Sequence, residues 1–499
     1  MTNVNALAAG SAILLLGFSL KPESAFGEAR RRASTGLGIA AGVSGIGWIL
    51  ANSELLPIRS LSQIGVSPDA FGSGFLGVVP SVICLVGLVA VALSDSISHS
   101  VSTLKRILYL LALAMVFVGS TEPVLLGLCW TLSPLVAWAE LRSRTEFAGV
   151  SRLFAIFHVP SVVLFIAALF AHELGGSALF AAAALIAIGI REAVIPGHSW
   201  FVRFVEKAPM GLVVAFVAPQ LGVYAHMELL AQSVPLELAR VVAVFGALTA
   251  LVAAMLGLVQ TSARRGLAYL MMSQTGLVAF GIEGTSSVAL VGSLVAWQVL
   301  AVATTGFAMT LSALEARRGE LSLTGFSGCF SRTPRMAGGF LMMGLGSVGF
   351  PLTLGFVAED LLVQGSVQEF PLLSLVLIVA TAFNGMNVMR SFFHLFSGVR
   401  VHTGEADLTN RESWSLSAVL VVLLIGGLVP GAITSREFGG AEPESILSRS
   451  EGAKVEAGMT SSTQESVANA EAHDGPMIDS KLGGEVSRAQ YVVGDKDER

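Results

Sequence analysis

Several ionisable residues of this chain lie within or at the ends of long apolar stretches, where a charge is costly and marks a candidate functional site. Glu359 ends one such stretch, and Arg191 and Glu192 lie five and four residues before Pro196 at the end of another. Carboxylate and basic side chains at membrane depth can relay protons or bind a transported cation. We therefore expect Glu359 and Arg191 to carry function. His158, well inside a further stretch, either takes part or bonds a neighbouring backbone carbonyl.

The elements that carry these residues are apolar segments long enough to cross a bilayer. About fourteen of them are separated by short loops, and each is long and continuous, unlike the short alternating strands of a membrane barrel. With 53% hydrophobic and 13% charged residues and a mean hydropathy of +0.74, the composition excludes an ordinary soluble protein. The sequence predicts an all-α polytopic membrane protein with about fourteen transmembrane helices, two of them broken.

The loops predict the orientation of the chain in the membrane. Loops after odd-numbered stretches carry about nineteen Lys and Arg residues, and loops after even-numbered stretches carry about two. Because basic residues stay on the cytoplasmic side during insertion, both termini are expected on the non-cytoplasmic side of the cell membrane. The first stretch has no Lys or Arg before it and is therefore expected to be retained, unlike a secretory signal.

Three regions follow from the composition and, for the first boundary, from the motif matches given below. Residues 1–104 are expected to form N-terminal transmembrane helices, and residues 105–434 the main transmembrane domain. Residues 435–499 are rich in Ser, Gly, Glu, Asp and Ala, with few aromatics. Such a segment cannot bury enough apolar area to offset its ordering, so it is expected to be a disordered polar tail.

Helix-breaking residues fall inside two of the apolar stretches. Pro219 lies in the middle of one, and Pro351 follows Gly349 in another. A broken helix frees backbone groups that must line a cavity or find a partner. Both breaks therefore point to transport, and they do not distinguish a proton relay from a solute site.

No motif for a cofactor is present in the sequence. There is no phosphate-binding loop and no dinucleotide fingerprint, and Cys84, Cys129 and Cys329 have no metal-ligand spacing. We expect no cofactor, no metal, no nucleic-acid partner and no catalytic site of the chain's own. Any enzymatic role would be as a subunit of a larger translocase.

Three motifs, in order, carry a family resemblance over about residues 105–434. They are Pro196-Gly197-His198-Ser199-Trp200 with Glu206–Pro209, Gln260–Tyr269 with Ser273–Gly276, and Gly349–Glu359. They resemble signatures of the antiporter-like, proton-translocating subunits of respiratory complex I (NADH-quinone oxidoreductase) and of Mrp-type cation/proton antiporters.

The resemblance implies a chain of buried ionisable groups and waters that relays protons, switched by a carboxylate–lysine pair. By position, Glu359 matches the family's late acid and Arg191 its basic residue before the first motif. Thr131 stands where the family has the carboxylate, and Gln220 where it has the lysine on its first broken helix. Hydroxyl and amide groups cannot exchange protons near neutral pH. Candidates to replace the missing group are Glu140, Glu192 and His158.

The leading hypothesis is a membrane subunit of an NADH-quinone oxidoreductase-like energy-converting complex that moves protons or monovalent cations. Its expected partners are the bilayer and other membrane and redox subunits. One alternative is a structural or coupling subunit without translocation, including the membrane partner of an inorganic-carbon uptake system. A second alternative is an independent transporter of a small solute.

Overall fold

The computed structural model describes residues 6–20, 25–52, 78–173, 177–230, 234–284, 286–328, 330–398 and 406–430. The described part of the chain contains helices and no β-strand, in agreement with the expected all-α class. The expected disordered tail, residues 435–499, lies outside the described residues, and the three expected regions stay a prediction.

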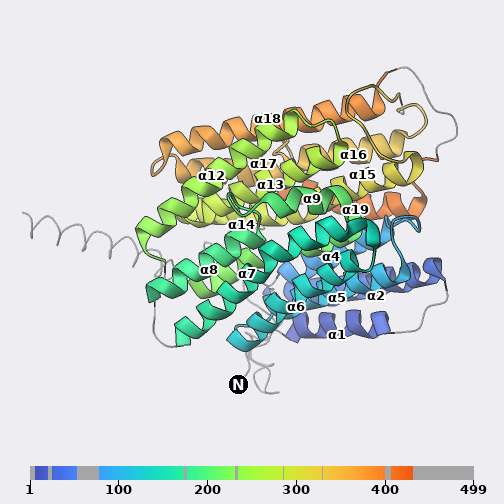
Figure 1. Cartoon of the computed structure of the whole chain (residues 1–499). Coiled ribbons are helices and arrows are strands. Elements are labelled where there is room, and N and C mark those ends of the chain that lie inside the picture. The colour runs from blue at the N-terminus through green and yellow to red at the C-terminus, as the bar shows by residue number, and fades with distance from the viewer. Residues whose placement is uncertain are drawn as a thin grey trace, which may run out of the picture. The chain divides into compact units, whose positions relative to one another are not determined.

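The helices run along the bundle and lie side by side (Figure 1). The N-terminal half contains α1 (Ala6–Leu20), α2 (Phe26–Asn52), α4 (Val79–Ala92), α5 (Val101–Val118), α6 (Pro123–Arg142), η3 (Thr145–Phe147), α7 (Ala148–Glu173), α8 (Ser177–Arg191) and α9 (Ser199–Lys207). The C-terminal half contains α10 (Met210–Val217), α11 (Leu221–Ala225), η4 (His226–Leu230), α12 (Leu236–Leu258), α13 (Ala263–Ile282), α14 (Ser287–Val299), η5 (Leu300–Thr304), α15 (Thr305–Arg318), α16 (Pro334–Ser347), α17 (Leu354–Ser366), α18 (Pro371–Phe396) and α19 (Asn410–Leu428).

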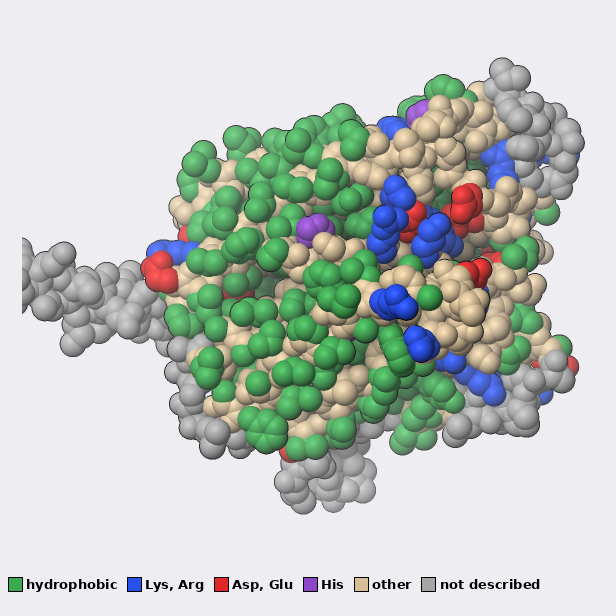
Figure 2. Space-filling model, in the orientation of Figure 1, with side chains coloured by type: hydrophobic (Ala, Val, Ile, Leu, Met, Phe, Trp, Pro, Cys, Tyr) green, Lys and Arg blue, Asp and Glu red, His purple; other side chains and the backbone are tan. Residues whose placement is uncertain are grey.

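The outer surface of this bundle suits a lipid environment. Among the described residues, eight helices are long and apolar enough to cross a membrane, and Val79–Ala92 and Leu179–Arg191 are shorter apolar helices. Hydrophobic side chains cover much of the visible face, whereas many charged side chains gather toward one end (Figure 2). The membrane-spanning character of the chain follows from these helices, while the number of fourteen crossings remains a prediction.

Both expected helix breaks are present. Helix α10 ends at Val217 and α11 begins at Leu221, and Gln220 between them adopts a left-handed conformation with φ 39° and ψ 65°. Helix α16 ends at Ser347 and α17 begins at Leu354. A third interruption separates α8 from α9 around Pro196. Pro196 was expected to lie just beyond the end of an apolar stretch, so this interruption was not one of the two predicted helix breaks.

One end of the bundle, where α4 ends and α5 begins, is held by arginines from distant helices; we call it the basic end. Arg30 of α2 donates to the Ser94 carbonyl at 2.9 Å, and Arg411 of α19 donates to the Ala92 carbonyl at 3.0 Å. These carbonyls close the last turn of α4, where no further helical N–H can reach them. The arginines therefore cap α4 and fix its position against α2 and α19.

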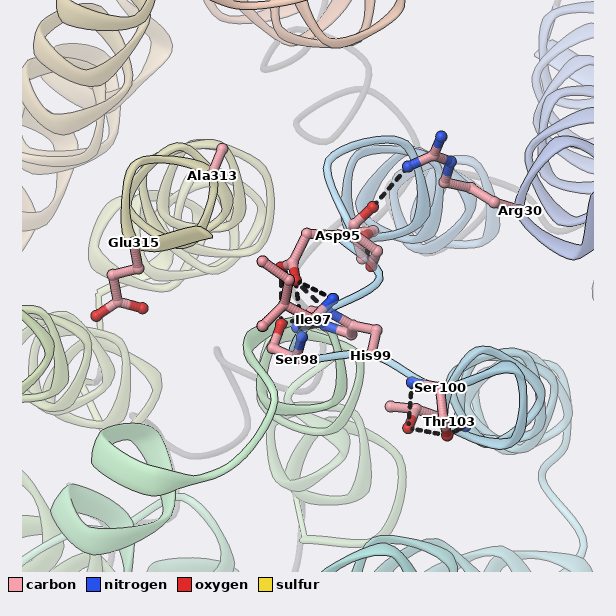
Figure 3. Close-up of polar contacts among 12 residues, drawn as sticks. Arg30, Asp95, Ile97, Ser98, His99, Ser100, Thr103, Ala313 and Glu315 are labelled. Carbon is pink, nitrogen blue, oxygen red and sulfur yellow. Dashed lines mark hydrogen bonds and ion pairs between the residues drawn. The ribbon is translucent and has the colours of Figure 1, made fainter. Parts of the chain in front are cut away.

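Asp95 organises the loop after α4 (Figure 3). Its Oδ1 accepts the backbone N–H groups of Ile97 and Ser98 at 2.8 and 2.7 Å, and its Oδ2 lies 3.6 Å from Nδ1 of His99. The other ring nitrogen of His99 accepts the N–H of Gly211 at 3.1 Å, which ties the loop to α10. Burial alone would raise the pKa of Asp95, but its hydrogen bonds with His99 and Ser98 outweigh burial and hold the pKa well below its ordinary value.

We predict that Asp95→Asn lowers the thermal stability of the protein most at neutral pH. A carboxylate whose pKa is lower in the folded state contributes stability above its unfolded-state pKa of about 3.9, and this contribution is lost as the pH falls through the folded-state pKa. The difference in melting temperature between wild type and variant, measured in detergent, should therefore shrink below about pH 4. A constant difference from pH 7 to pH 3 would contradict this account.

Close contact between α12 and α13 depends on two glycines. A Cβ on Gly246 would lie 2.7 Å from the backbone nitrogen of Phe280, and one on Gly276 would lie 2.6 Å from the backbone nitrogen of Ala250. Helices without side chains at the contact can approach until their backbones touch, as is common in membranes. The position of α13, which carries several residues of the site below, depends on this contact.

We predict that Gly276→Ala destabilises the protein by about 1–3 kcal/mol, because the new methyl group meets backbone atoms that cannot move away. Gly385→Ala in α18 is the matched control, since a Cβ there has nothing within 4 Å. Thermal unfolding of the two variants in the same detergent should separate them clearly. Equal melting temperatures would show that α12 and α13 are not in close contact here.

Candidate functional site

The break between α10 and α11 is held by side chains of α13 and α14. The indole N–H of Trp297 donates to the Pro219 carbonyl at 3.2 Å, and the Gln220 amide nitrogen donates to the Thr275 hydroxyl at 3.0 Å. Gln220 is 1% exposed, and its Oε1 has no hydrogen-bond partner within the described residues. Freed backbone groups at this depth thus find side-chain partners, and an amide oxygen is left available at the break.

The break between α8 and α9 is held in the same way. The Trp200 indole donates to the Ile190 carbonyl at 2.9 Å, and the Ile195 N–H donates to the Thr249 hydroxyl of α12 at 3.0 Å. Trp200 is the tryptophan of the first sequence motif. Its role in this structure is to bond a carbonyl at the end of α8 and so to fix the position of Arg191, the next residue.

Arg191 is a buried cation surrounded by aromatic rings. It is 6% exposed, one guanidinium nitrogen donates to Ser133 at 2.9 Å, and the group lies 4.7 Å from the ring centres of both Trp130 and Phe216. Its Nη1 has no hydrogen-bond partner, and no carboxylate forms an ion pair with it in the described part of the chain. Cation–π contacts with two rings stabilise the charge in place of a salt bridge.

Thr131 and Glu140 do not contact this cation. The Thr131 hydroxyl donates to the Gly127 carbonyl of its own helix at 2.8 Å. Glu140 is 1% exposed and lies at the basic end, where it forms ion pairs with Arg106 and Arg144. Neither of these two candidates on α6 therefore contacts Arg191. The contact is made by Ser133, which the sequence analysis did not single out.

His158 lies in an aromatic cluster close to Arg191. Its ring stacks on Phe154 at 3.9 Å and meets Trp200 edge-on at 4.4 Å, and Phe216 contacts both His158 and Arg191. Its Nδ1 lies 3.0 Å from the Phe154 carbonyl, whereas Nε2 has no partner among the described residues. This geometry agrees with the second alternative given above for His158, an imidazole that bonds a backbone carbonyl of its own helix. It provides no partner for proton transfer among the described residues.

Glu192 lines a large cavity beside the broken helices. Its Oε1 accepts the Gly222 N–H of α11 at 2.8 Å, so the carboxylate closes the first turn of that helix. The cavity has a volume of about 690 Å³ and lies between α7, α8, α11, α12 and α13. Its wall also contains Glu283 and His226, whose Nδ1 lies 3.5 Å from the Glu283 carboxylate. The structure buries both His226 and Glu283.

Glu359 lies at the other break, in the first turns of α17. It has a hydrogen bond with Thr381 of α18, and its Oε1 is buried without a partner among the described residues. The carboxylate packs against Gly349, where a Cβ would overlap it and where φ is +70°. Gly349 therefore both permits the turn between α16 and α17 and leaves room for the acid. Asp360, the next residue, is exposed.

Neutral polar groups lie along the helices between the two breaks. Helix α11 packs on α8, Gln220 joins α11 to α13, α13 packs on α14, and α14 packs on α17. Helices α13, α14 and α18 and the η5 segment carry buried neutral polar atoms that have no partner among the described residues, namely Gln274 Nε2, Gln298 Nε2, Thr304 Oγ1, Asn384 Oδ1 and Asn387 Oδ1. Buried polar groups are usually satisfied, and ordered water is the common partner where protein supplies none. We call these groups, together with Gln220 and Thr275, the amide axis.

The sequence of this chain is similar to that of a known family of membrane proteins. Residues 142–384 match the model of the NADH:quinone oxidoreductase/Mrp antiporter transmembrane family. The chain is 26% identical over 444 residues to NADH-quinone oxidoreductase subunit 14 of Thermus thermophilus, covering 85% of this chain and 96% of that one. It is 23% identical over 274 residues to NADH-quinone oxidoreductase subunit M of Rickettsia conorii, covering 53% of this chain and 54% of that one. The chain thus spans about half the length of several curated relatives that it matches.

Two solved structures share the fold. A chain of respiratory complex I from Thermus thermophilus aligns with a TM-score of 0.74 and 18% identity, covering 86% of this chain and 97% of that one. A chain of the Mrp complex from Dietzia sp. aligns with a TM-score of 0.72 and 16% identity, covering 89% and 98%. At these identities the comparison shows the fold, and the resemblance read from the sequence motifs agrees with it.

We predict that Ser133→Ala destabilises the protein by about 1–3 kcal/mol, because it removes the one hydroxyl that bonds a buried cation. Thr131→Val is the matched control on the same helix, since its hydroxyl only bonds its own backbone and should be almost neutral. Thermal unfolding in detergent measures both. If Thr131→Val proved the more damaging variant, the assignment of Ser133 as the partner of Arg191 would be wrong.

Proposed function

We propose that this chain, whose residues 142–384 belong to the NADH:quinone oxidoreductase/Mrp antiporter family, is a membrane subunit that moves protons or monovalent cations as part of a larger energy-converting complex. The observation that carries the proposal is the amide axis. Its groups lie on α13, α14, η5 and α18 and at the break before α11, while the titratable Glu192 and Glu359 lie at the break after α8 and at the break before α17.

The carboxylates at the two breaks differ in chemistry from the groups of the amide axis. Glu192 and Glu359 can bind and release a proton, whereas the amides and hydroxyls between them can only hold and orient water. Arg191 stays protonated at any ordinary pH, so it cannot give up a proton to a neighbouring group and instead supplies a fixed positive charge. In this proposal protons load onto a carboxylate at one break and cross the hydrated middle to the carboxylate at the other. Gln220, at the position of the family's lysine, carries no charge, so Arg191 supplies the positive charge in this part of the proposal.

The relatives support a place in an assembly. The matched proteins are named as subunits of NADH-quinone oxidoreductase, and the matched structures are chains of multi-subunit membrane complexes. We propose that other membrane subunits, and redox subunits that drive transport, are partners of this chain. In this assignment both termini lie on the non-cytoplasmic side, with the basic end facing the cytoplasm.

A subunit without translocation is the second candidate, and one observation favours it. Thr131 and Gln220, in place of the family's pair, bond the Gly127 carbonyl and the Thr275 hydroxyl, and neither contacts Arg191. Removing both charges of a buried pair is far less costly than removing one, so such a chain could keep its fold while losing transport. It would then anchor a partner, such as the soluble component of an inorganic-carbon uptake system.

We predict that Glu359→Gln reduces ion flux at least about tenfold, because the amide keeps the shape of the carboxylate but cannot exchange a proton. Asp360→Asn, at the exposed neighbouring position, is the matched control and should leave flux unchanged. The measurement uses the native complex, purified through a tag on this chain and reconstituted in proteoliposomes with pH- and sodium-sensitive dyes.

The same experiment separates the two candidates. Loss of flux in Glu359→Gln alone supports translocation through this chain, and the dye that responds identifies the ion. Full flux in both Glu359→Gln and Arg191→Ala would leave the chain as a structural or coupling subunit. Mass spectrometry of the purified complex identifies the partners in either case.

A further inference from the structure

The wall of the 690 Å³ cavity includes apolar side chains that are exposed on the outside of the bundle. Residues of its wall on α7, α8 and α12 lie on the outer faces of these helices, and Ile156, Ile186 and Val241 are 65%, 54% and 50% exposed. Hydrophobic side chains cover this region of the molecule (Figure 2). A molecule dissolved in the hydrocarbon of the membrane therefore reaches the cavity without crossing a polar surface.

The floor of the cavity is acidic, whereas its other described walls are apolar. The four polar side chains among the lining residues are Glu192, His226, Thr275 and Glu283, and no Lys or Arg is among them. The neighbouring cation, Arg191, turns its guanidinium away, toward Ser133 and Trp130. A ligand in the cavity therefore meets carboxylates at one end and hydrocarbon-like surface elsewhere.

Glu192 supplies a free acceptor on this floor. The residue is 8% exposed, and the hydrogen bond from Gly222 to its Oε1 fixes its direction. Its second oxygen, Oε2, has no hydrogen-bond partner in the described part of the chain, although the side chain lines the cavity. A carboxylate oxygen held in a mostly apolar cavity needs a donor, and a charged donor is the strongest available.

We infer that this cavity is a binding site for a lipophilic organic cation, a molecule with an ammonium or amidinium head and an apolar tail. The head lies against Glu192 and Glu283, and the tail occupies the space between α7, α8 and α12. The volume lies within the usual range of about 300–1,000 Å³ for ligand pockets. Burying the tail removes apolar area from water, which favours binding. An anionic amphiphile would instead face two carboxylates, and a neutral one would leave Oε2 without a charged partner.

Photo-labelling of the full chain in phosphatidylcholine nanodiscs tests this inference. The probes are a dodecylamine and a dodecanol that carry the same diazirine in the chain, and labelled peptides are mapped by mass spectrometry. We expect the amine to label the segments that line the cavity in α7, α8 and α12. The Glu192→Gln/Glu283→Gln double variant should reduce amine labelling about tenfold, as loss of a charged hydrogen bond implies, with little change for the alcohol.

Two further variants make the result decisive. Glu228→Gln changes an exposed carboxylate of the neighbouring η4 segment that does not line the cavity, so amine labelling should be unchanged. Val241→Trp places a large side chain at the mouth of the cavity. Because Val241 is exposed, this substitution should not disturb folding, and it should abolish labelling by both probes. Equal labelling by amine and alcohol would mean that the cavity accepts lipid chains without regard to charge. That result, or cavity labelling that survives Val241→Trp, would overturn the inference. No transport is measured, so the outcome is independent of the proposed function.

Discussion

The structure depends on one constraint, which is that hydrocarbon offers no partner to a backbone N–H or carbonyl group. Three of the helices are interrupted inside the bundle, and each interruption exposes such groups. At two of these interruptions side chains satisfy them: Trp297 bonds the Pro219 carbonyl and Glu192 the Gly222 N–H at the break before α11, and Thr249 bonds the Ile195 N–H at the break after α8. The same side chains therefore hold the breaks together and bring polar atoms to the middle of the membrane.

The constraint also explains how a lone cation is tolerated at this depth. Arg191 forms no ion pair with a carboxylate among the described residues, yet it contacts a hydroxyl and two aromatic faces. A guanidinium is more weakly hydrated than an ammonium and stacks on aromatic rings, so it is better suited than lysine to such a setting.

The fold was predictable from the sequence because its cause is local. Long apolar runs must form helices in a membrane, and Pro219 and Pro351 mark two of the three breaks. The site was predictable only in part. Sequence position alone selected Thr131, whereas the orientation of α6 presents Ser133 to Arg191. The Glu283–His226 pair joins residues from two helices, and no spacing in the sequence reveals it.

Apart from Gln220, the amides of the axis were not singled out from the sequence, and the reason is physical. A search for charges inside apolar stretches passes over Gln274, Gln298 and Asn384, because neutral amides cost less to bury and leave a weak signal in the sequence. Their number becomes meaningful only when the fold brings them together. Each such group lowers the cost of holding water, and none can hold a proton.

The difference between groups that can carry a charge and groups that can only hold water constrains any mechanism of transport. A cation that crosses near Arg191 meets a fixed positive charge in a medium of low dielectric constant, where the repulsion is much stronger than in water. In the transport that we propose, the fixed charge therefore opposes the passage of an alkali cation past the break after α8.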